Sequence, residues 1–158
     1  MIMIDDKTIK IIVKKSIEKM FQKDADLFEV NINERTISHK LAEYLQCELS
    51  DLNVDCEYNR HIENLKTLEL PKDQINWNDT EAKTVFPDII IHKRKKNINI
   101  AVIEIKKSSS SVDRMIDKNK LKAFTKEPYN YYLGIFIEIN TQNKKFDMRF
   151  FKGGEELK

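Results

Sequence analysis

Three charged side chains stand in otherwise apolar, strand-like segments and together could cleave a phosphodiester. Asp88 opens the run at residues 86–92, and Glu104 and Lys106 lie near the close of the run at 98–106. Alternate residues of a strand share a face, so Glu104 and Lys106 point the same way. If these consecutive runs pair antiparallel, Asp88 and Glu104 meet at one end of the pair. The spacing therefore predicts a cluster of two carboxylates and one lysine.

The chemistry that fits such a cluster is metal-assisted hydrolysis. Mg²⁺ takes oxygen ligands and is typically held by one or two carboxylates, several waters and the substrate phosphate. The ion polarises the phosphoryl oxygen and makes a coordinated water more acidic. Lys106 would orient or deprotonate that water, or steady the pentavalent phosphorus. Taken singly, each residue is more simply a surface charge; taken together, they favour a Mg²⁺ site in which Mn²⁺ can substitute.

The pairs Pro87-Asp88 and Glu104-Ile105-Lys106 resemble the motif of the PD-(D/E)XK nuclease superfamily, which has a restriction-endonuclease-like core. By order of elements the resemblance extends over about residues 30–140. It implies metal ligation by Asp88, Glu104 and the backbone carbonyl of Ile105, with Lys106 in the active site. Some branches carry a glutamine and a tyrosine on the later helix that contact nucleic acid. This chain has Lys120 and Phe124 near those positions, which departs from the pattern of an exonuclease-like branch.

Many members of that superfamily add a glutamate from the helix before the first strand, and Glu34 is the candidate here. The apolar residues of segment 33–45 recur at helical spacing, and Glu34 lies seven residues before Leu41, near the same stripe. This helix is expected to end near Ser50-Asp51. An acid at this place is either a metal ligand or a complement to the helix dipole, and both interpretations remain open. His39 lies off the stripe and is expected to flank it or to be exposed.

The remaining pattern predicts an α/β domain, with a central mixed β-sheet flanked by α-helices. Apolar residues at steps of three and four predict a helix at residues 7–22, and Asp113 can cap a later helix that reaches about Phe124. The expected strands are residues 54–60, 85–92, 98–105, 131–139 and 144–151. With 158 residues, the chain fits one domain. We expect an N-terminal helix within 1–28, a core at 29–151 and a tail at 152–158.

Net charge gives little support for a nucleic-acid partner, because 28 basic residues nearly cancel 26 acidic ones. The distribution of charge is more informative. Lys93, Arg94 and Lys95 lie in the expected turn between two strands, and Lys120 and Lys122 lie in the later helix. Each is a candidate phosphate contact. The simpler interpretation is that the turn keeps a sheet edge solvated and that the helix lysines cover an exposed face.

Two further groups of residues carry open alternatives. Asp55 and Glu57 alternate with apolar residues and would either border the proposed metal site or cover a solvated sheet face. Residues 61–84 lack sustained periodicity and are expected to form a long connection or lid. Trp77 within it would stack on a base or, more simply, pack the loop onto the domain.

The chain lacks the marks of a secreted, zinc-binding or membrane protein. The two cysteines form no close pair to join the three histidines in a zinc-site spacing, and they favour a reduced, cytoplasmic protein. No apolar run approaches the ~18 residues of a membrane span, and acids follow the first four residues at once, unlike a signal peptide.

These observations favour a Mg²⁺-dependent nuclease, with DNA preferred to RNA as the substrate. A homodimer is expected if the protein cuts both strands of a duplex. One alternative is a non-catalytic nucleic-acid-binding or protein-interaction module that shares the fold. Another is a subunit of a larger defence or repair complex. Activity of the isolated protein would argue against both.

Overall fold

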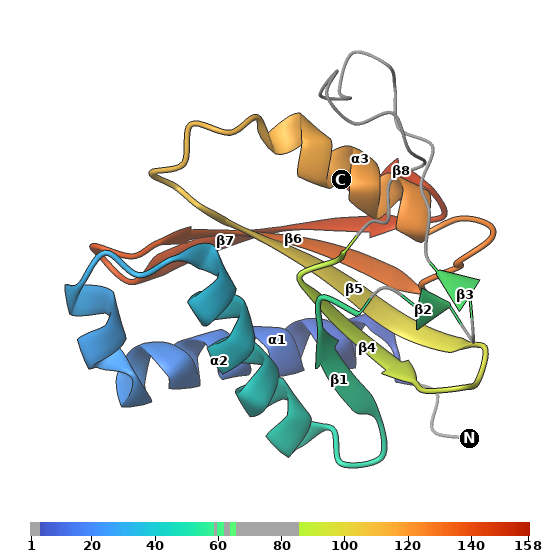
Figure 1. Ribbon diagram of the computed structural model, residues 1–158, viewed down its shortest axis with the longest axis horizontal. Coiled ribbons are helices and arrows are strands. Elements are labelled where there is room, and N and C mark those ends of the chain that lie inside the picture. The colour runs from blue at the N-terminus through green and yellow to red at the C-terminus, as the bar shows by residue number, and fades with distance from the viewer. Residues whose placement is uncertain (1–3, 59, 62–63, 66–85) are drawn as a thin grey trace.

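The computed structural model describes residues 4–58, 60–61, 64–65 and 86–158, which form a mixed α/β fold (Figure 1). The helical elements are α1 (Asp6–Lys23), the 3₁₀ helix η1 (Ala25–Glu29), α2 (Glu34–Glu48) and α3 (Arg114–Phe124). The strands are β1 (Asn53–Cys56), β2 (Arg60–His61), β3 (Asn64–Leu65), β4 (Ile89–Lys93), β5 (Ile98–Lys107), β6 (Leu133–Asn140), β7 (Lys145–Lys152) and β8 (Glu155–Glu156).

The helices begin where the sequence supplies a polar side chain for the first free N–H groups. Asp5, Asn33 and Asp113 each accept a hydrogen bond from a backbone N–H in the first turn of α1, α2 and α3, at 2.8 to 2.9 Å. The predicted helices at 7–22 and after Asp113 are therefore confirmed. No helix in the described part of the chain is both long and apolar enough to cross a membrane.

The main sheet has six strands in the order β1-β4-β5-β6-β7-β8. Every neighbouring pair is antiparallel except β5 and β6, which are parallel. α3 lies in the connection between these two strands, as a parallel pair requires a crossover. The expectation of a mixed sheet flanked by helices is confirmed.

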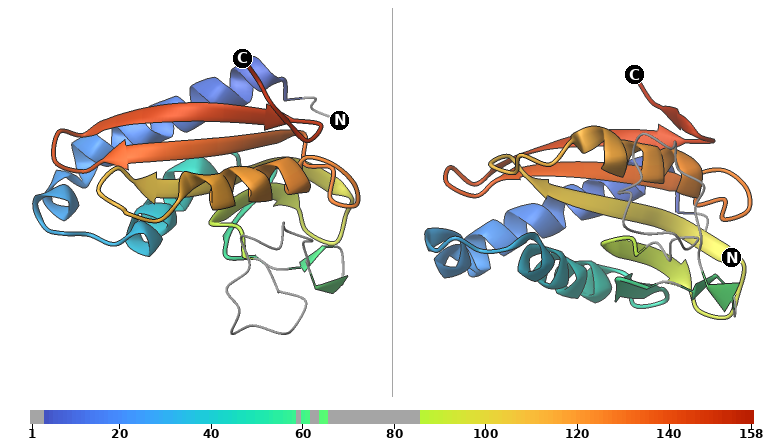
Figure 2. Two further views of the ribbon diagram at one scale, coloured as in Figure 1. Left: turned by 90° about the horizontal axis from the view of Figure 1, so that it is seen from above. Right: turned by 45° about the horizontal axis from the view of Figure 1, so that its top comes forward.

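The two faces of the sheet are covered by different helices (Figures 1 and 2). Ile103 and Ile105 of β5 belong to the core that α1 and α2 complete. Val102 belongs to a second core formed with Leu121 and Phe124 of α3. Because strand residues alternate, Glu104 and Lys106 lie on the α3 face. The apolar packing of α3 therefore fixes what surrounds these two charged side chains.

The structure also corrects several predicted boundaries. The second helix ends at Glu48 rather than near residue 50, and the first strand of the sheet ends at Cys56, with β2 following as part of a separate two-stranded sheet. The expected tail contains β8, which pairs with the end of β7. Most of the connection at 61–84, including Trp77, lies outside the described residues.

Candidate active site

Asp88 and Glu104 are brought to the same end of the β4–β5 pair. In this antiparallel pair Ile89 is opposite Ile103, so Asp88, which directly precedes β4, comes level with Glu104. Asp88 Oδ2 accepts a hydrogen bond from the backbone N–H of Ile105 at 2.7 Å. This bond ties the loop before β4 to the C-terminal part of β5. The sequence had predicted the meeting of the two acids from antiparallel pairing of the two runs.

Glu104 is a buried carboxylate, with 1% of the residue exposed. Its Oε2 accepts a hydrogen bond from the Lys120 ammonium at 2.9 Å. Its Oε1 is buried and accepts no hydrogen bond from the described residues. A buried polar atom without a partner is costly, so this oxygen requires an additional ligand or a proton.

Lys106 lies on the same face and is held by acids from two helices. Its ammonium is 3.0 Å from Asp117 Oδ2 of α3 and 3.7 Å from Glu34 Oε2 of α2. Asp117 Oδ1 is also 3.8 Å from the Lys120 ammonium. Charges of opposite sign thus alternate from Glu34 through Lys106, Asp117 and Lys120 to Glu104.

Asp117 was not among the predicted site residues, although the sequence carries a signal for it. Asp117 precedes Leu121 by four residues and Phe124 by seven, so it lies on the apolar stripe of α3. An acid on such a stripe is buried against the sheet and needs a partner. The sequence does not show that Lys106 is that partner.

Glu34 lies at the edge of the cluster and holds the end of β5. Its Oε1 accepts a hydrogen bond from the backbone N–H of Lys107 at 3.0 Å. Glu34 is also the first residue of α2, where a negative charge complements the helix dipole. Both observations give Glu34 a positioning role, and its use as a metal ligand remains a prediction.

Burial raises the pKa of Glu104 well above the ordinary value of 4.5, although the Lys120 charge acts in the opposite direction. Burial likewise raises the pKa of Asp88, although the hydrogen bond from Ile105 and the charges of Lys120 and Lys106 oppose the rise. The charge of Asp117 raises the pKa of both carboxylates, and the charge of Asp88 also raises the pKa of Glu104. The pair therefore favours a proton or a bound cation at neutral pH.

The folded state without metal should consequently lose stability as pH rises. The folded-state pKa of Glu104 exceeds its unfolded value, so the protonated carboxyl stabilises the folded state. This contribution to the free energy of unfolding is complete below about pH 4.5 and is lost as pH rises through the folded-state pKa. For one proton the loss is at most about 1.4 kcal/mol per pH unit. Glu104→Gln should flatten this decline, leaving only the part due to Asp88. Urea unfolding in EDTA between pH 5 and 8 measures the decline in the free energy of unfolding for both proteins.

The control is Glu138→Gln, since Glu138 lies opposite Lys106 on the neighbouring strand but pairs with Arg114 at 2.8 Å and is partly exposed. That variant should keep the wild-type pH dependence. Equal slopes for wild type and Glu104→Gln would show that Glu104 does not carry the proton.

The metal site expected from the sequence would use Asp88, Glu104 and the main-chain carbonyl of Ile105, and it remains a prediction. Within the described residues, no three His, Cys, Asp or Glu side chains come together to hold an ion by themselves. The buried Glu104 Oε1, however, is directed to no other partner there, and Asp88 uses only one oxygen for Ile105. Mg²⁺ accepts such a small protein ligand set.

No family model, curated protein or solved structure matches this chain.

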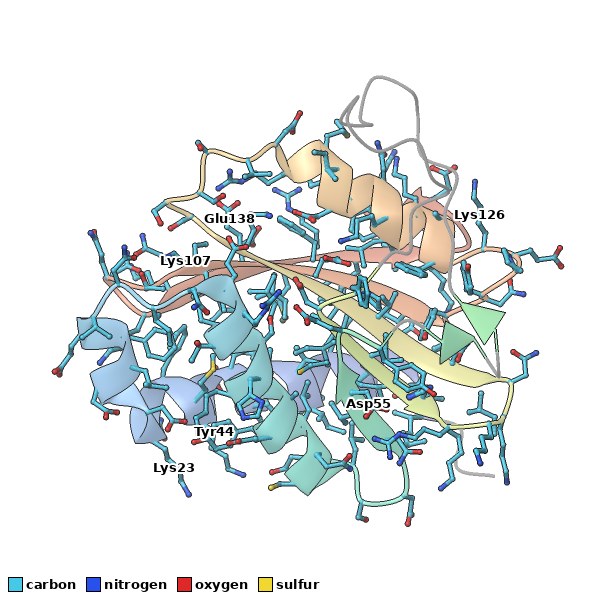
Figure 3. All side chains as sticks on the ribbon, in the orientation of Figure 1. Lys23, Tyr44, Asp55, Lys107, Lys126 and Glu138 are labelled. Atoms are coloured by element: carbon cyan, nitrogen blue, oxygen red, sulfur yellow. The ribbon has the colours of Figure 1, made fainter. Side chains whose placement is uncertain are left out.

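A polar hollow borders the cluster at its Glu34 end and has a volume of about 1100 Å³. Glu34 and Lys107 line it, together with the serine run at 108–111 and the turn between β6 and β7 at 140–142. Figure 3 labels Lys107 and Glu138 in this region, near the start of α2. The hollow offers hydroxyl and amide groups beside Glu34, which lies 3.7 Å from the Lys106 ammonium.

The predicted basic residues of the turn lie at the opposite end of β4 from Asp88. The Lys93 ammonium donates to the carbonyl of Asp51 at 2.6 Å, and Arg94 pairs with Asp55. Lys95 occupies the turn with φ +58°. The structure thus separates these three residues from the acids by the length of a strand, and any contact they make with nucleic acid is remote from the proposed chemistry.

The two predicted lysines of α3 differ from each other. Lys120 points into the cluster, and 15% of its side chain is exposed. This contradicts its assignment to an exposed helix face, because the pairing with Glu104 draws it inward. Lys122 is half-buried two residues further along α3, and its phosphate contact remains a prediction.

Asp55 and Glu57 do not join the cluster. Asp55, labelled in Figure 3, pairs with His92 at 2.8 Å and with Arg94. Glu57 pairs with Arg35 at 2.9 Å. Neither Asp55 nor Glu57 is therefore positioned as a further metal ligand.

His39 is exposed, as expected, and lies 2.9 Å from Glu43.

Proposed function

We propose that this chain is a Mg²⁺-dependent nuclease of the PD-(D/E)XK type with a restriction-endonuclease-like core. The observation that carries the proposal is the junction of Asp88, on the loop before β4, with Glu104 and Lys106 on one face of β5. The order helix, three strands, helix, strand agrees with the core of that superfamily. Its elements here are α2, β1, β4, β5, α3 and β6.

Asp88, Glu104 and the carbonyl of Ile105 are the proposed ligands. When bound, Mg²⁺ supplies a Lewis acid for the phosphoryl oxygen and a more acidic water. The protein contributes two carboxylates whose burial makes a cation favourable there. The hydrogen bond from Ile105 N–H fixes one Asp88 oxygen and so orients the other.

Lys106 is better suited to stabilise charge than to remove a proton. Burial lowers the pKa of Lys106, but the hydrogen bond and charge of Asp117, with the charges of Glu34 and Asp88, outweigh burial and raise it. The ammonium is therefore protonated at neutral pH. Its proposed role is to hold the non-bridging oxygens as negative charge develops on phosphorus.

DNA is the proposed substrate, with the polar hollow as its approach to Lys106. Serine hydroxyls and asparagine or glutamine amides bind phosphate and sugar oxygens without reading sequence. The hollow carries such groups at 108–111 and 140–142 beside Lys107. This arrangement supports backbone recognition, with bases read elsewhere if they are read at all.

A second candidate is a non-catalytic module in which the acids and lysines form a structural network. The internal pairs Lys120–Glu104 and Lys106–Asp117 favour it, because they occupy charged groups that the nuclease would use. Buried ion pairs of this kind also occur in proteins for structural reasons. Metal binding separates the two candidates.

The test is cleavage of circular and linear DNA, single and double stranded, by the purified protein with Mg²⁺, Mn²⁺ or EDTA. We expect cutting with either ion and none in EDTA. An RNA substrate in parallel tests the preference for DNA. Absence of cutting, together with absence of metal binding, would favour the structural module.

A further inference from the structure

The Lys120 ammonium lies where positive charge is most needed in the cluster. It reaches from α3 to Glu104 Oε2 at 2.9 Å and is 3.8 Å from Asp117 Oδ1. Its charge also acts on Asp88, the other proposed ligand. Lys120 thus contacts one of the two carboxylates that the proposed function assigns to the metal, and its charge lowers the pKa of the other.

The other charged groups around this point are already engaged. Lys106 on β5 is paired with Asp117 at 3.0 Å and lies 3.7 Å from Glu34 of α2. Among the described residues, Lys120 is consequently the cation that pairs with Glu104. Lysine has a flexible four-carbon stem, so this ammonium can withdraw along α3 without a change in the backbone.

We propose that Lys120 is an internal cation that competes with the divalent metal for Glu104, an inference that rests on the proposed metal site. An ammonium and a divalent ion repel each other when both lie within contact of one buried carboxylate. Even when the metal binds the unpartnered Oε1, this repulsion favours the release of Oε2 by Lys120. The fraction of molecules with Lys120 released then sets the apparent metal affinity.

This competition gives the cluster two states. With Lys120 on Glu104, the fold is stable in the absence of metal because the buried carboxylate keeps a partner. With metal bound, Lys120 turns outward and becomes available to a phosphate of the substrate. The position of Lys120 thus sets the metal concentration at which the site becomes competent.

The test compares Lys120→Met with wild type by titration of Mn²⁺, followed by electron paramagnetic resonance of the free ion in DNA-free solution. Methionine retains much of the length of lysine and removes the competing charge. If the paired state is favoured about tenfold, removal of Lys120 should tighten Mn²⁺ binding about tenfold. Mg²⁺ should also raise the thermal midpoint of Lys120→Met more than that of wild type, because binding to the folded state stabilises it by mass action.

Lys122→Met is the matched control. Lys122 lies on the same helix as Lys120 but about 200° around the helix axis from it. The Lys122→Met variant should therefore bind Mn²⁺ with the affinity of wild type. If Lys120→Met does not fold without metal, Lys120→Gln carries the same test, since its amide can donate to Glu104 without a charge.

The outcomes separate this inference from the proposed function. Tighter binding by Lys120→Met than by wild type supports competition. Equal or weaker binding by the variant overturns competition but leaves the metal site in place. Absence of Mn²⁺ binding by wild type and by both Lys120 variants at millimolar concentration overturns the metal site, and the competition with it.

Discussion

Asp88→Asn should lower Mg²⁺-dependent DNA cleavage by about 10³-fold, equivalent to about 4 kcal/mol of lost transition-state stabilisation. The reason is that asparagine carries no charge and replaces one of the two carboxylate oxygens by an NH2 group, which does not bind a metal. Its remaining oxygen can still accept the hydrogen bond from Ile105 N–H, so the loop before β4 should keep its position. Initial rates of plasmid cleavage across a Mg²⁺ series measure the loss.

The stability of this variant is a second readout. Because burial raises the pKa of Asp88, loss of its charge should not weaken the fold in EDTA. Asp147→Asn serves as the control, since it removes an exposed carboxylate from β7. Cleavage by Asp88→Asn within tenfold of wild type, with the control unchanged, would remove Asp88 from the site.

The meeting of Asp88 and Glu104 was predictable because it follows from local rules. Two short apolar runs joined by a polar turn favour an antiparallel pair, and alternation then decides which side chains share a face. The register that places Ile89 opposite Ile103 depends also on a β-bulge between Ile91 and His92, because direct continuation of the Lys93–Ile98 pair would place Ile89 opposite Val102. The local rules thus predicted the end at which the acids and Lys106 meet, whereas the sequence did not reveal the bulge that sets the register.

The partners of those residues were less predictable because α3 supplies them across the sheet. Asp117 and Lys120 meet Lys106 and Glu104 only when Leu121 and Phe124 pack α3 onto β5 and β6. Spacing within α3 reveals its apolar stripe but not its rotation relative to the sheet. A lysine beside such a stripe is ordinarily exposed, and only the buried Glu104 makes the inward position favourable.

β8 shows a signal that was present but not used. The two-residue connection between β7 and β8 is Gly153-Gly154, and both glycines have positive φ. That conformation suits a two-residue hairpin turn, and paired glycines are among its sequence marks. The segment after Lys152 is therefore a short strand, where charge and position at the chain end had favoured a tail.

Lys106→Met is expected to reduce the cleavage rate by about 10²-fold while leaving Mn²⁺ affinity close to that of wild type. The proposed role of Lys106 is charge stabilisation at phosphorus, and removal of one such group typically costs this much. Lys106→Arg retains the positive charge and should recover part of the rate. Single-turnover cleavage and Mn²⁺ titration of the same preparations measure the two quantities separately.

That separation distinguishes a catalytic lysine from a structural one. If Lys106 served only to neutralise Asp117 and Glu34, its loss would lower stability and disturb metal binding as well as the rate, and arginine would restore all three together. Lys118→Met is the control, because Lys118 lies on α3 with its ammonium 5.9 Å from the Phe136 ring centre. A wild-type rate in Lys106→Met would transfer the phosphate role to another cation. Lys120 is the nearest described candidate, because metal binding would release it from Glu104.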